Sequence, residues 1–228
     1  MNKIFLETSN KKSYECNLIR ILLKRLGKEE GQDFEIVCVG GKDNLSKHEV
    51  KLAEHESDTE VNLIIFDADT PTTGGGYKKR AEELKQTLNL LNENSNRNEI
   101  FLFPNNEGDG ALEDLLEQII NPEHCCIMEY FDTYEQSLAS HKDTDGKDKY
   151  QTPDQKARMF AYISAFKKTS TQREHLKKGD WMFDNPQFWD LNAAALQPLK
   201  NFLAHHLNTS ETAEASHTTN KNPPAWFQ

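Results

Sequence analysis

The chain has 228 residues, of which 36% are hydrophobic and 28% charged, and its formal net charge is −10. This length allows one domain of moderate size with an appended segment. The acidity argues against a broad nucleic-acid surface, because phosphate contacts require clustered Lys and Arg, but it leaves room for a local basic groove. No apolar stretch approaches the roughly 18 residues of a membrane span, and the first residues lack a signal-peptide core. We therefore expect a cytoplasmic protein without a membrane partner.

The first 120 residues alternate between strand and helix patterns. Short apolar runs predict strands at residues 3–7, 34–39, 61–66 and 99–103. Apolar residues at helical spacing predict helices at residues 13–27, 44–55, 77–94 and 110–120. In the first of these helices, Ser13 fits the N-cap and Gly27 fits the end.

This alternation predicts a parallel sheet with helices on both faces. The run at residues 61–66 shows no polar alternation, which is typical of a strand that is covered on both sides. Short connections favour successive β-α-β units with right-handed crossovers. Ligands of such sheets bind beyond the carboxyl ends of the strands. We therefore expect the functional site in the loops after Leu6, Val39, Phe66 and Phe103.

The second half of the chain gives weaker patterns. Residues 126–131 predict a further strand, and residues 139–152 a polar loop. A helix is expected at residues 152–168, with Thr152 as its cap, and a final helix at residues 192–207, with an aromatic connector at 181–191 between them. We expect an α/β domain at residues 1–120, a mostly helical extension packed on it at 121–207 and a disordered tail at 208–228.

Acidic residues follow the predicted strands at the edge where ligands are expected. Glu7 ends the first strand, Asp67 and Asp69 follow the third, and Asp109 and Glu113 follow the fourth. Carboxylates in one cleft repel each other and lose hydration, so a bound cation would stabilise them. Oxygen ligands without His or Cys favour Mg²⁺ or Mn²⁺, and alternate residues of an extended chain point the same way. Because Asp is also common in turns, a structural turn is the alternative interpretation.

The order of these features resembles the Toprim domain, which is shared by topoisomerases, bacterial primases and nucleases of the overcoming-lysogenization-defect (OLD) type. The Toprim pattern has a glutamate at the end of the first strand, a glycine turn after the second and D-x-D after the third. These positions hold Glu7, then Gly40 and Gly41, then Asp67 and Asp69.

The whole chain is also similar to a family of uncharacterised stand-alone Toprim-like bacterial proteins related to the OLD nuclease domain. In that family a stretch like PNNEGDGALEDLL follows the fourth strand, as residues 104–116 do here. The Toprim likeness covers residues 1–120 and the closer likeness extends to residue 207. It implies an α/β fold with a Toprim-like, Rossmann-like four-stranded parallel sheet flanked by helices and a C-terminal helical extension. One difference is Thr8, which follows the glutamate where the Toprim pattern has glycine.

The resemblance implies roles for individual acidic residues. Glu7 would act as a general acid/base or as a metal ligand, and Asp67 and Asp69 would bind magnesium. Glu113, together with Asp109, would complete a second metal position, as in the nuclease branch of the family.

It also points to residues that would contact substrate. A lysine beyond the core often assists the nuclease branch, and Lys156 is the candidate here, with a solvated helix lysine as the alternative. The turn at Gly40 and Gly41 is assigned to substrate binding. The basic candidates are Lys78 and Lys79 in residues 77–80 and the segment 167–178; each also fits a solvated helix face or loop.

The leading hypothesis is a magnesium- or manganese-dependent nuclease, a hydrolase that cleaves phosphodiester bonds in nucleic acid, with DNA favoured over RNA. The alternative is a non-catalytic Toprim-like module that binds nucleic acid or nucleotide, or that regulates a partner ATPase. Metal binding at Glu7, Asp67 and Asp69 separates these two. A phospho-receiver is a third hypothesis, because Pro71 follows Asp67 by four residues. It lacks the acidic pair after the first strand and the lysine that receivers require.

Overall fold

The computed structural model describes residues 1–57, 59–91 and 97–208. The predicted disordered tail, apart from its first residue, lies outside this range. Among the described residues, no helix is long and apolar enough to cross a membrane.

The centre of the fold is a four-stranded sheet in which all strands are parallel, in the order β2-β1-β3-β4. The strands are β1 (Asn2–Leu6), β2 (Phe34–Cys38), β3 (Asn62–Asp67) and β4 (Asn98–Phe103). The predicted α/β class and parallel sheet are confirmed. In the register of the sheet, Leu6 pairs with both Cys38 and Ile65, and Asp67 pairs with Phe103. The carboxyl ends of all four strands therefore meet at one edge.

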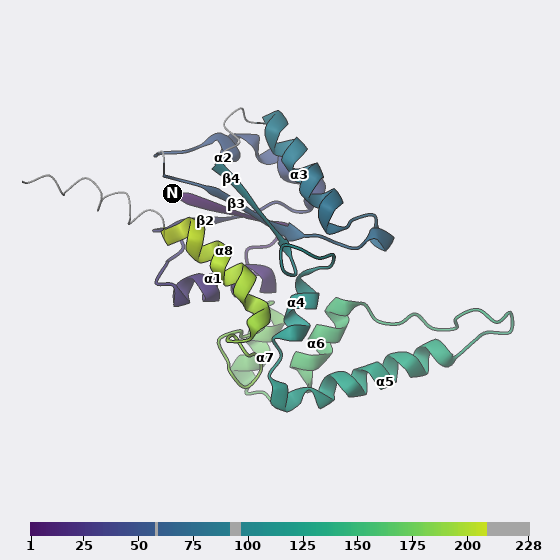
Figure 1. The fold of residues 1–228 in the computed structure, drawn as a ribbon. Helices are drawn as coiled ribbons and strands as arrows, with labels where there is room; N and C mark the ends of the chain where they lie inside the picture. The colour runs from purple at the N-terminus through teal and green to yellow at the C-terminus, as the bar shows by residue number, and fades with distance from the viewer. Residues whose placement is uncertain (58, 92–96, 209–228) are drawn as a thin grey trace, which may run out of the picture.

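Helices cover both faces of the sheet (Figure 1). On one face, α2 (Glu49–Ala53) and α3 (Tyr77–Leu91) pack against side chains such as Phe5. On the other face, Ile4 packs with α1 (Tyr14–Arg25) and with the C-terminal helices. Because neighbouring residues of one strand enter two separate cores, the strands carry no polar alternation.

Three of the predicted helices in the first half match closely. Helix α3 begins at Tyr77 as predicted, and residues 92–94 of that prediction lie outside the described residues. The Ser13 side chain caps α1 by accepting a 3.3 Å hydrogen bond from the Cys16 N–H, and the helix ends before Gly27, which has φ +74°. Helix α4 (Leu112–Gln118) occupies the centre of its predicted range. The predicted helix at 44–55 is instead a 3-10 turn (Lys42–His48) followed by the short α2.

The predicted strand at residues 126–131 is wrong, because this segment begins α5 (Cys126–Ser140). A short apolar run fits either a strand or a helix, and tertiary contacts decide between them. Here Asp132 and Glu135, three residues apart, both bind Arg158 of α6 (Gln155–Ala165) at 2.5 and 3.1 Å. Only a helix places residues at that spacing on one side.

The remaining C-terminal helices differ from prediction mainly at their ends. Helix α6 (Gln155–Ala165) is capped by Asp154, which accepts a 2.7 Å hydrogen bond from the Ala157 N–H, and not by Thr152. A separate helix, α7 (Ser170–Lys177), follows a capping box between Thr169 and Gln172. The last helix, α8 (Gln197–Asn208), begins after a 3-10 turn, so Pro198 lies in its first turn.

The aromatic connector at residues 181–191 joins the C-terminal helices to the sheet domain. Trp189 is buried and its indole N–H donates a 2.8 Å hydrogen bond to the Trp181 carbonyl. Tyr162 of α6 donates a 2.6 Å hydrogen bond to the Phe188 carbonyl. Trp181 stacks on Tyr14 of α1, with ring centroids 4.1 Å apart. The apolar core therefore continues across residue 120.

The packing of α8 generates a stability prediction. Leu199 of α8 is fully buried, so Leu199→Ala should lower the free energy of unfolding by about 2–5 kcal/mol, measured by urea denaturation. The matched control is Leu90→Ala, which removes a leucine that is 88% exposed and should change stability by less than about 0.5 kcal/mol. Equal small effects would show that α8 does not contribute to the core.

Candidate functional site

The carboxyl edge of the sheet brings acidic residues from three segments together. Glu7 directly follows β1, Asp67 ends β3, and Glu113 lies in the first turn of α4. A Glu7 carboxylate oxygen accepts a 3.4 Å hydrogen bond from the Asp67 N–H, and Asp67 Oδ1 accepts a 2.8 Å bond from the Leu112 N–H. Backbone hydrogen bonds thus tie the end of each segment to the next.

Glu113 is buried and is held by Tyr14 from the start of α1. The Tyr14 hydroxyl donates a 2.5 Å hydrogen bond to Glu113 Oε1. Burial, followed by the charge of Glu113, raises the pKa of Tyr14 far above its usual range. Tyr14 therefore stays protonated and serves as a fixed donor to this carboxylate.

Burial makes the ionised forms of Asp67 and Glu7 unfavourable. Burial, followed by the charges of Glu113 and Glu7, raises the pKa of Asp67 well above its ordinary value. Burial also raises the pKa of Glu7; the charge of Asp69 adds to this shift, and the Asp67 N–H opposes it. With all of these groups ionised, the site would carry more negative charge than its own hydrogen bonds balance.

Glu15 belongs to the same group, and the sequence analysis missed it. Burial, followed by the charges of Glu113 and Glu7, raises the pKa of Glu15 to about 7. Its Oε2 atom is buried and has no hydrogen-bond partner among the described residues. The sequence did contain a signal for Glu15, which lies in the first turn of the helix after β1. The first turn of a helix that follows a parallel strand lies at the carboxyl edge of the sheet.

Asp69 lies near this group, but its carboxylate is paired with basic side chains. Its Oδ2 is 2.7 Å from the Arg80 guanidinium and 3.7 Å from Lys42 Nζ. The backbone of Asp69 has φ +59° and exchanges two hydrogen bonds with Gly110, so the chain is no longer extended there. The expectation that Asp67 and Asp69 point the same way along an extended chain is therefore wrong.

Arg80 is a second residue that sequence reasoning overlooked. It is buried on α3, where it binds Asp69 and Glu83, each at 2.7 Å. The signal was its spacing, because Arg80, Leu84 and Leu88 lie four residues apart and share the buried face of α3.

Other predicted residues lie outside the buried acidic group. Asp109 is exposed and accepts a 2.6 Å hydrogen bond from the Tyr77 N–H, so it caps the start of α3. Lys78 and Lys79 are exposed on α3, and Lys79 donates to the Gly74 carbonyl at 2.8 Å. The structure thus brings Glu7, Asp67 and Glu113 together, whereas Asp109 serves as the cap at the start of α3.

The glycine turn contacts the segment that carries Glu7. The Gly40 N–H donates to the Thr8 carbonyl at 3.0 Å, and the Gly41 N–H donates to the Glu7 carbonyl at 2.7 Å. Both glycines have positive φ, +77° and +115°, which side-chain-bearing residues rarely adopt. This turn directs the Lys42 N–H to Glu7 Oε1, at 3.2 Å.

Lys156, on the first turn of α6, lies beside the acidic group. Its ammonium nitrogen is 5.0 Å from the centroid of the Tyr14 ring, and its charge lowers the pKa of Glu15. The C-terminal extension therefore brings a cation next to carboxylates that the sheet domain supplies.

The donor set suits a hard cation, although its present arrangement is not a formed metal site. No group of three His, Cys, Asp or Glu residues in the described part of the chain is placed to hold a metal ion. Carboxylate oxygens are nevertheless the ligands that Mg²⁺ and Mn²⁺ prefer. Glu15 Oε2 is buried without a partner, and only the Oε1 atom of Glu113 accepts a hydrogen bond from the described residues. Rotation of these side chains would be needed to complete a coordination shell.

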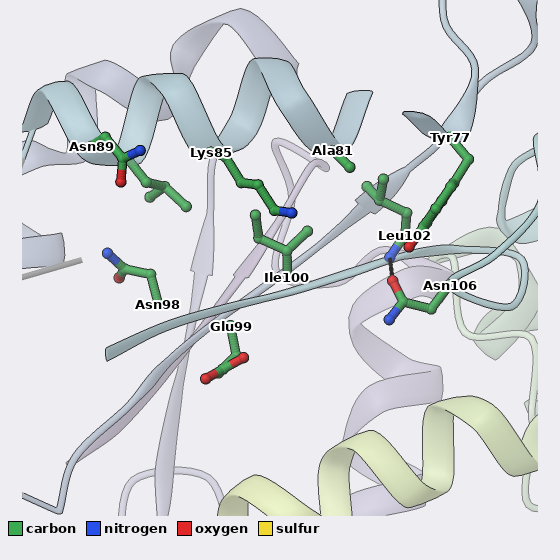
Figure 2. A pocket seen from close by; sticks show the side chains of 10 residues that line it. Tyr77, Ala81, Lys85, Asn89, Asn98, Glu99, Ile100, Leu102 and Asn106 are labelled. Atoms are coloured by element: carbon green, nitrogen blue, oxygen red, sulfur yellow. Dashed lines mark hydrogen bonds between the residues drawn. The ribbon is translucent and has the colours of Figure 1, made fainter. Parts of the chain in front are cut away.

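A separate cavity of about 260 Å³ lies between α3 and the edge strand β4. Figure 2 shows its amide-rich lining, in which Asn106 Oδ1 accepts a 3.0 Å hydrogen bond from the Leu102 N–H. Glu99 is its only carboxylate, and none of the predicted site residues lines it. This cavity is therefore distinct from the acidic group.

The fold and the site define the protein as an open parallel α/β protein with a buried acidic group at the carboxyl edge of its sheet. The family described as "Protein of unknown function (DUF3226)" matches residues 2–208. The chain therefore belongs to the DUF3226 family. Searches of curated proteins and of solved structures found no match.

The raised pKa of Glu15 gives a prediction for stability. Since the pKa is about 7 in the folded state and 4.5 ordinarily, ionisation favours the unfolded chain as pH rises through this window. Without added metal, Glu15→Gln should therefore raise the free energy of unfolding at pH 8 by about 1–3 kcal/mol more than it does at pH 4.5.

Urea denaturation at the two pH values measures this difference. Glu49→Gln, which removes an exposed glutamate in the first turn of α2, is the matched control and should show no pH-dependent gain. A Glu15→Gln gain that is the same at both pH values would contradict an electrostatic origin.

Proposed function

We propose that this DUF3226 protein is a divalent-cation-dependent phosphodiesterase that acts on nucleic acid and is related to Toprim nucleases. The observation that carries the proposal is the placement of Glu7, Glu15 and Asp67 around one small cavity at the sheet edge. Glu113 lies close enough that its charge, after burial, raises the pKa of both Glu15 and Asp67. Burying like charges costs stability that an apolar group would not cost, so their presence calls for a cationic ligand. The observed family membership and parallel fold are compatible with this function.

In the proposed reaction, Asp67 and Glu113 would hold the cation, and Glu15 would provide a further oxygen. The bound cation would supply charge stabilisation for the attacking and departing oxygens of the phosphodiester. Glu7, whose pKa is raised by burial, is suited to accept and return a proton as a general acid/base. Lys156 stands where its ammonium group would contact a substrate phosphate beside the carboxylates.

The Toprim relation is supported by the order of the motif residues along the sheet edge. Glu7 follows β1, the Gly40–Gly41 turn follows β2 and Asp67 ends β3. The turn and the glutamate touch through the Gly41 N–H and the Glu7 carbonyl. Asp69 would act here by positioning Arg80 and Lys42 near Glu7.

A second candidate is a non-catalytic Toprim-like module that binds nucleic acid or nucleotide, or that regulates a partner ATPase. The observation that favours it is the ion pair of Asp69 with Arg80, which occupies a carboxylate that the nuclease hypothesis assigned to the metal. Turnover separates the two candidates.

The catalytic test compares the wild-type protein with Asp67→Asn. Asparagine keeps an oxygen that accepts from the Leu112 N–H but removes the charge. With Mg²⁺ or Mn²⁺, the wild type should cleave plasmid DNA, single-stranded DNA or RNA, and the variant should lose activity by on the order of 100-fold or more.

Asp145→Asn, in the exposed loop after α5, is the control and should cleave like the wild type. Wild-type protein without cleavage on any of these substrates, or equal cleavage by Asp67→Asn, would favour the binding module.

Cation binding can be tested apart from turnover. A ligand that binds only the folded state raises the melting temperature, so millimolar Mg²⁺ or Mn²⁺ should stabilise the wild type at pH 7.5. The Asp67→Asn and Glu113→Gln variants should lose this shift. Asp109→Asn should keep it, because Asp109 caps α3 outside the acidic group and asparagine caps a helix about as well as aspartate. Loss of the shift in Asp109→Asn would show instead that Asp109 contributes to cation binding.

A further inference from the structure

A groove lies next to the acidic group, where the C-terminal extension meets the loop after β1. Its lining comes from residues 8–14, from the start of α6 at residues 154–160 and from the end of α7 at residues 176–181. Its volume is about 850 Å³, within the size range of ligand-binding sites. The Asn17 amide of α1 donates a 3.3 Å hydrogen bond to the carbonyl of Gly179, which lines the groove, and so joins α1 to the segment after α7.

The groove is locally basic in a chain whose net charge is −10. Four lysines and a single carboxylate line it: Lys12, Lys156, Lys177, Lys178 and Asp154. Lys177 pairs with Glu174 at 3.0 Å, and the Asp154 carboxylate is used as the cap of α6. Within the described residues, the other three lysines have no ion pair. Their charges are therefore available to an anionic ligand.

The basic track continues beyond this groove. Lys12 and Lys178 also line an adjoining cavity of about 410 Å³, together with Lys11 and Arg20. In that cavity Arg20 pairs with Glu30 at 2.6 Å, Lys11 lies 3.9 Å from Glu35, and Asp180 also lines the wall. The cations without an ion pair are therefore Lys12 and Lys178, which line both cavities, and Lys156 of the groove. Three such lysines are more than a single phosphate group requires. This extent favours a polyanion over a small phosphate ligand.

An aromatic side chain lies among these lysines. Phe160 lines the groove and is 48% exposed, although it belongs to a helix whose Met159 and Ile163 are buried. It follows Lys156 by one helical turn, so the two side chains share one side of α6. In proteins that bind single strands, an unpaired base stacks on an exposed aromatic ring while neighbouring lysines neutralise the phosphate of that nucleotide.

Tyr14 connects the groove to the acidic group. Its ring lines the groove and stacks on Trp181, and its hydroxyl binds Glu113. Lys156 stands over the same ring. A strand that lies along the lysines would therefore reach the carboxylates at Tyr14.

We infer that this groove binds single-stranded nucleic acid, with phosphates at Lys12, Lys156 and Lys178 and a base stacked on Phe160. A duplex offers no unpaired base to Phe160, so single strands fit the groove better. The inference rests on the proposed function only for the direction of the strand, toward the acidic group. Binding itself can be measured without metal and without turnover.

The first experiment measures binding of a fluorescein-labelled 12-nucleotide single strand to the full chain by anisotropy, in EDTA, over a range of salt concentrations. Lys12→Gln/Lys178→Gln should weaken binding by about 10-fold and should reduce the slope of log K against log salt by about 1.4, or about 0.7 for each lost contact. Lys24→Gln/Lys147→Gln removes two exposed lysines elsewhere and should change neither value. Melting temperatures of all variants establish that they are folded.

The second experiment tests stacking. Phe160→Ala should weaken binding of the single strand by about 5-fold or more with an unchanged salt slope, and Phe160→Trp should retain binding. The control Tyr130→Ala, which removes an aromatic ring that is 70% exposed on α5, should bind like the wild type.

Several results would overturn the inference. These are no binding of the single strand by the wild type, an unchanged affinity in Lys12→Gln/Lys178→Gln, or binding of a 12-base-pair duplex as tight as that of the single strand. Binding of labelled thymidine monophosphate as tight as that of the 12-mer would also overturn it, in favour of a mononucleotide pocket.

The two proposals can fail separately. If the single strand binds through the groove but is never cleaved, the proposed function fails and the groove assignment stands. If Asp67-dependent cleavage proceeds with an unchanged KM in Lys12→Gln/Lys178→Gln, the proposed function stands and the groove assignment fails.

Discussion

The parallel direction of all four strands is the constraint on which the rest of this structure depends. Parallel neighbours can be joined only through crossovers, which here are helices, so every strand ends at the same edge. The register then sets the neighbours, since Leu6 pairs with Ile65 and Asp67 with Phe103. Glu7, Asp67 and the start of α4 are forced together although they are far apart in the chain.

Burying the resulting acidic group is unfavourable in free energy, and hydrogen bonds within the fold offset only part of this penalty. Backbone N–H groups of Lys42 and Leu112 and the hydroxyl of Tyr14 satisfy individual carboxylate oxygens. They leave Glu15 with an unpartnered oxygen and Asp67 with a strongly raised pKa. Apolar residues would fill the same space at lower cost, so a structural role alone does not account for these acids. The cation proposed above would offset this cost.

The C-terminal helices add the charges that the sheet domain lacks. Their aromatic connector packs Trp181 on Tyr14, and this contact fixes where α6 and α7 meet the loop after β1. Lys156 is thereby placed beside the carboxylate edge, and Lys178 and Lys12 line the same groove. The same contacts that complete the core therefore shape the basic groove, so the proposed binding would depend on side chains that also stabilise the fold.

Local patterns in the sequence were enough to predict the strands of the sheet, α1 with its Ser13 cap, and the position of the acids at one sheet edge. Apolar periodicity, helix capping and the rule that ligands bind at the carboxyl edge of a parallel sheet all depend on residues that are close together in the sequence. Tertiary structure alone decided that residues 126–131 form a helix and that Asp109 caps α3. It also decided which acids are buried. The partners in these contacts are distant in sequence, such as Tyr14 and Glu113 at a separation of 99 residues, and no local pattern records which side chain a folded chain will bring to another.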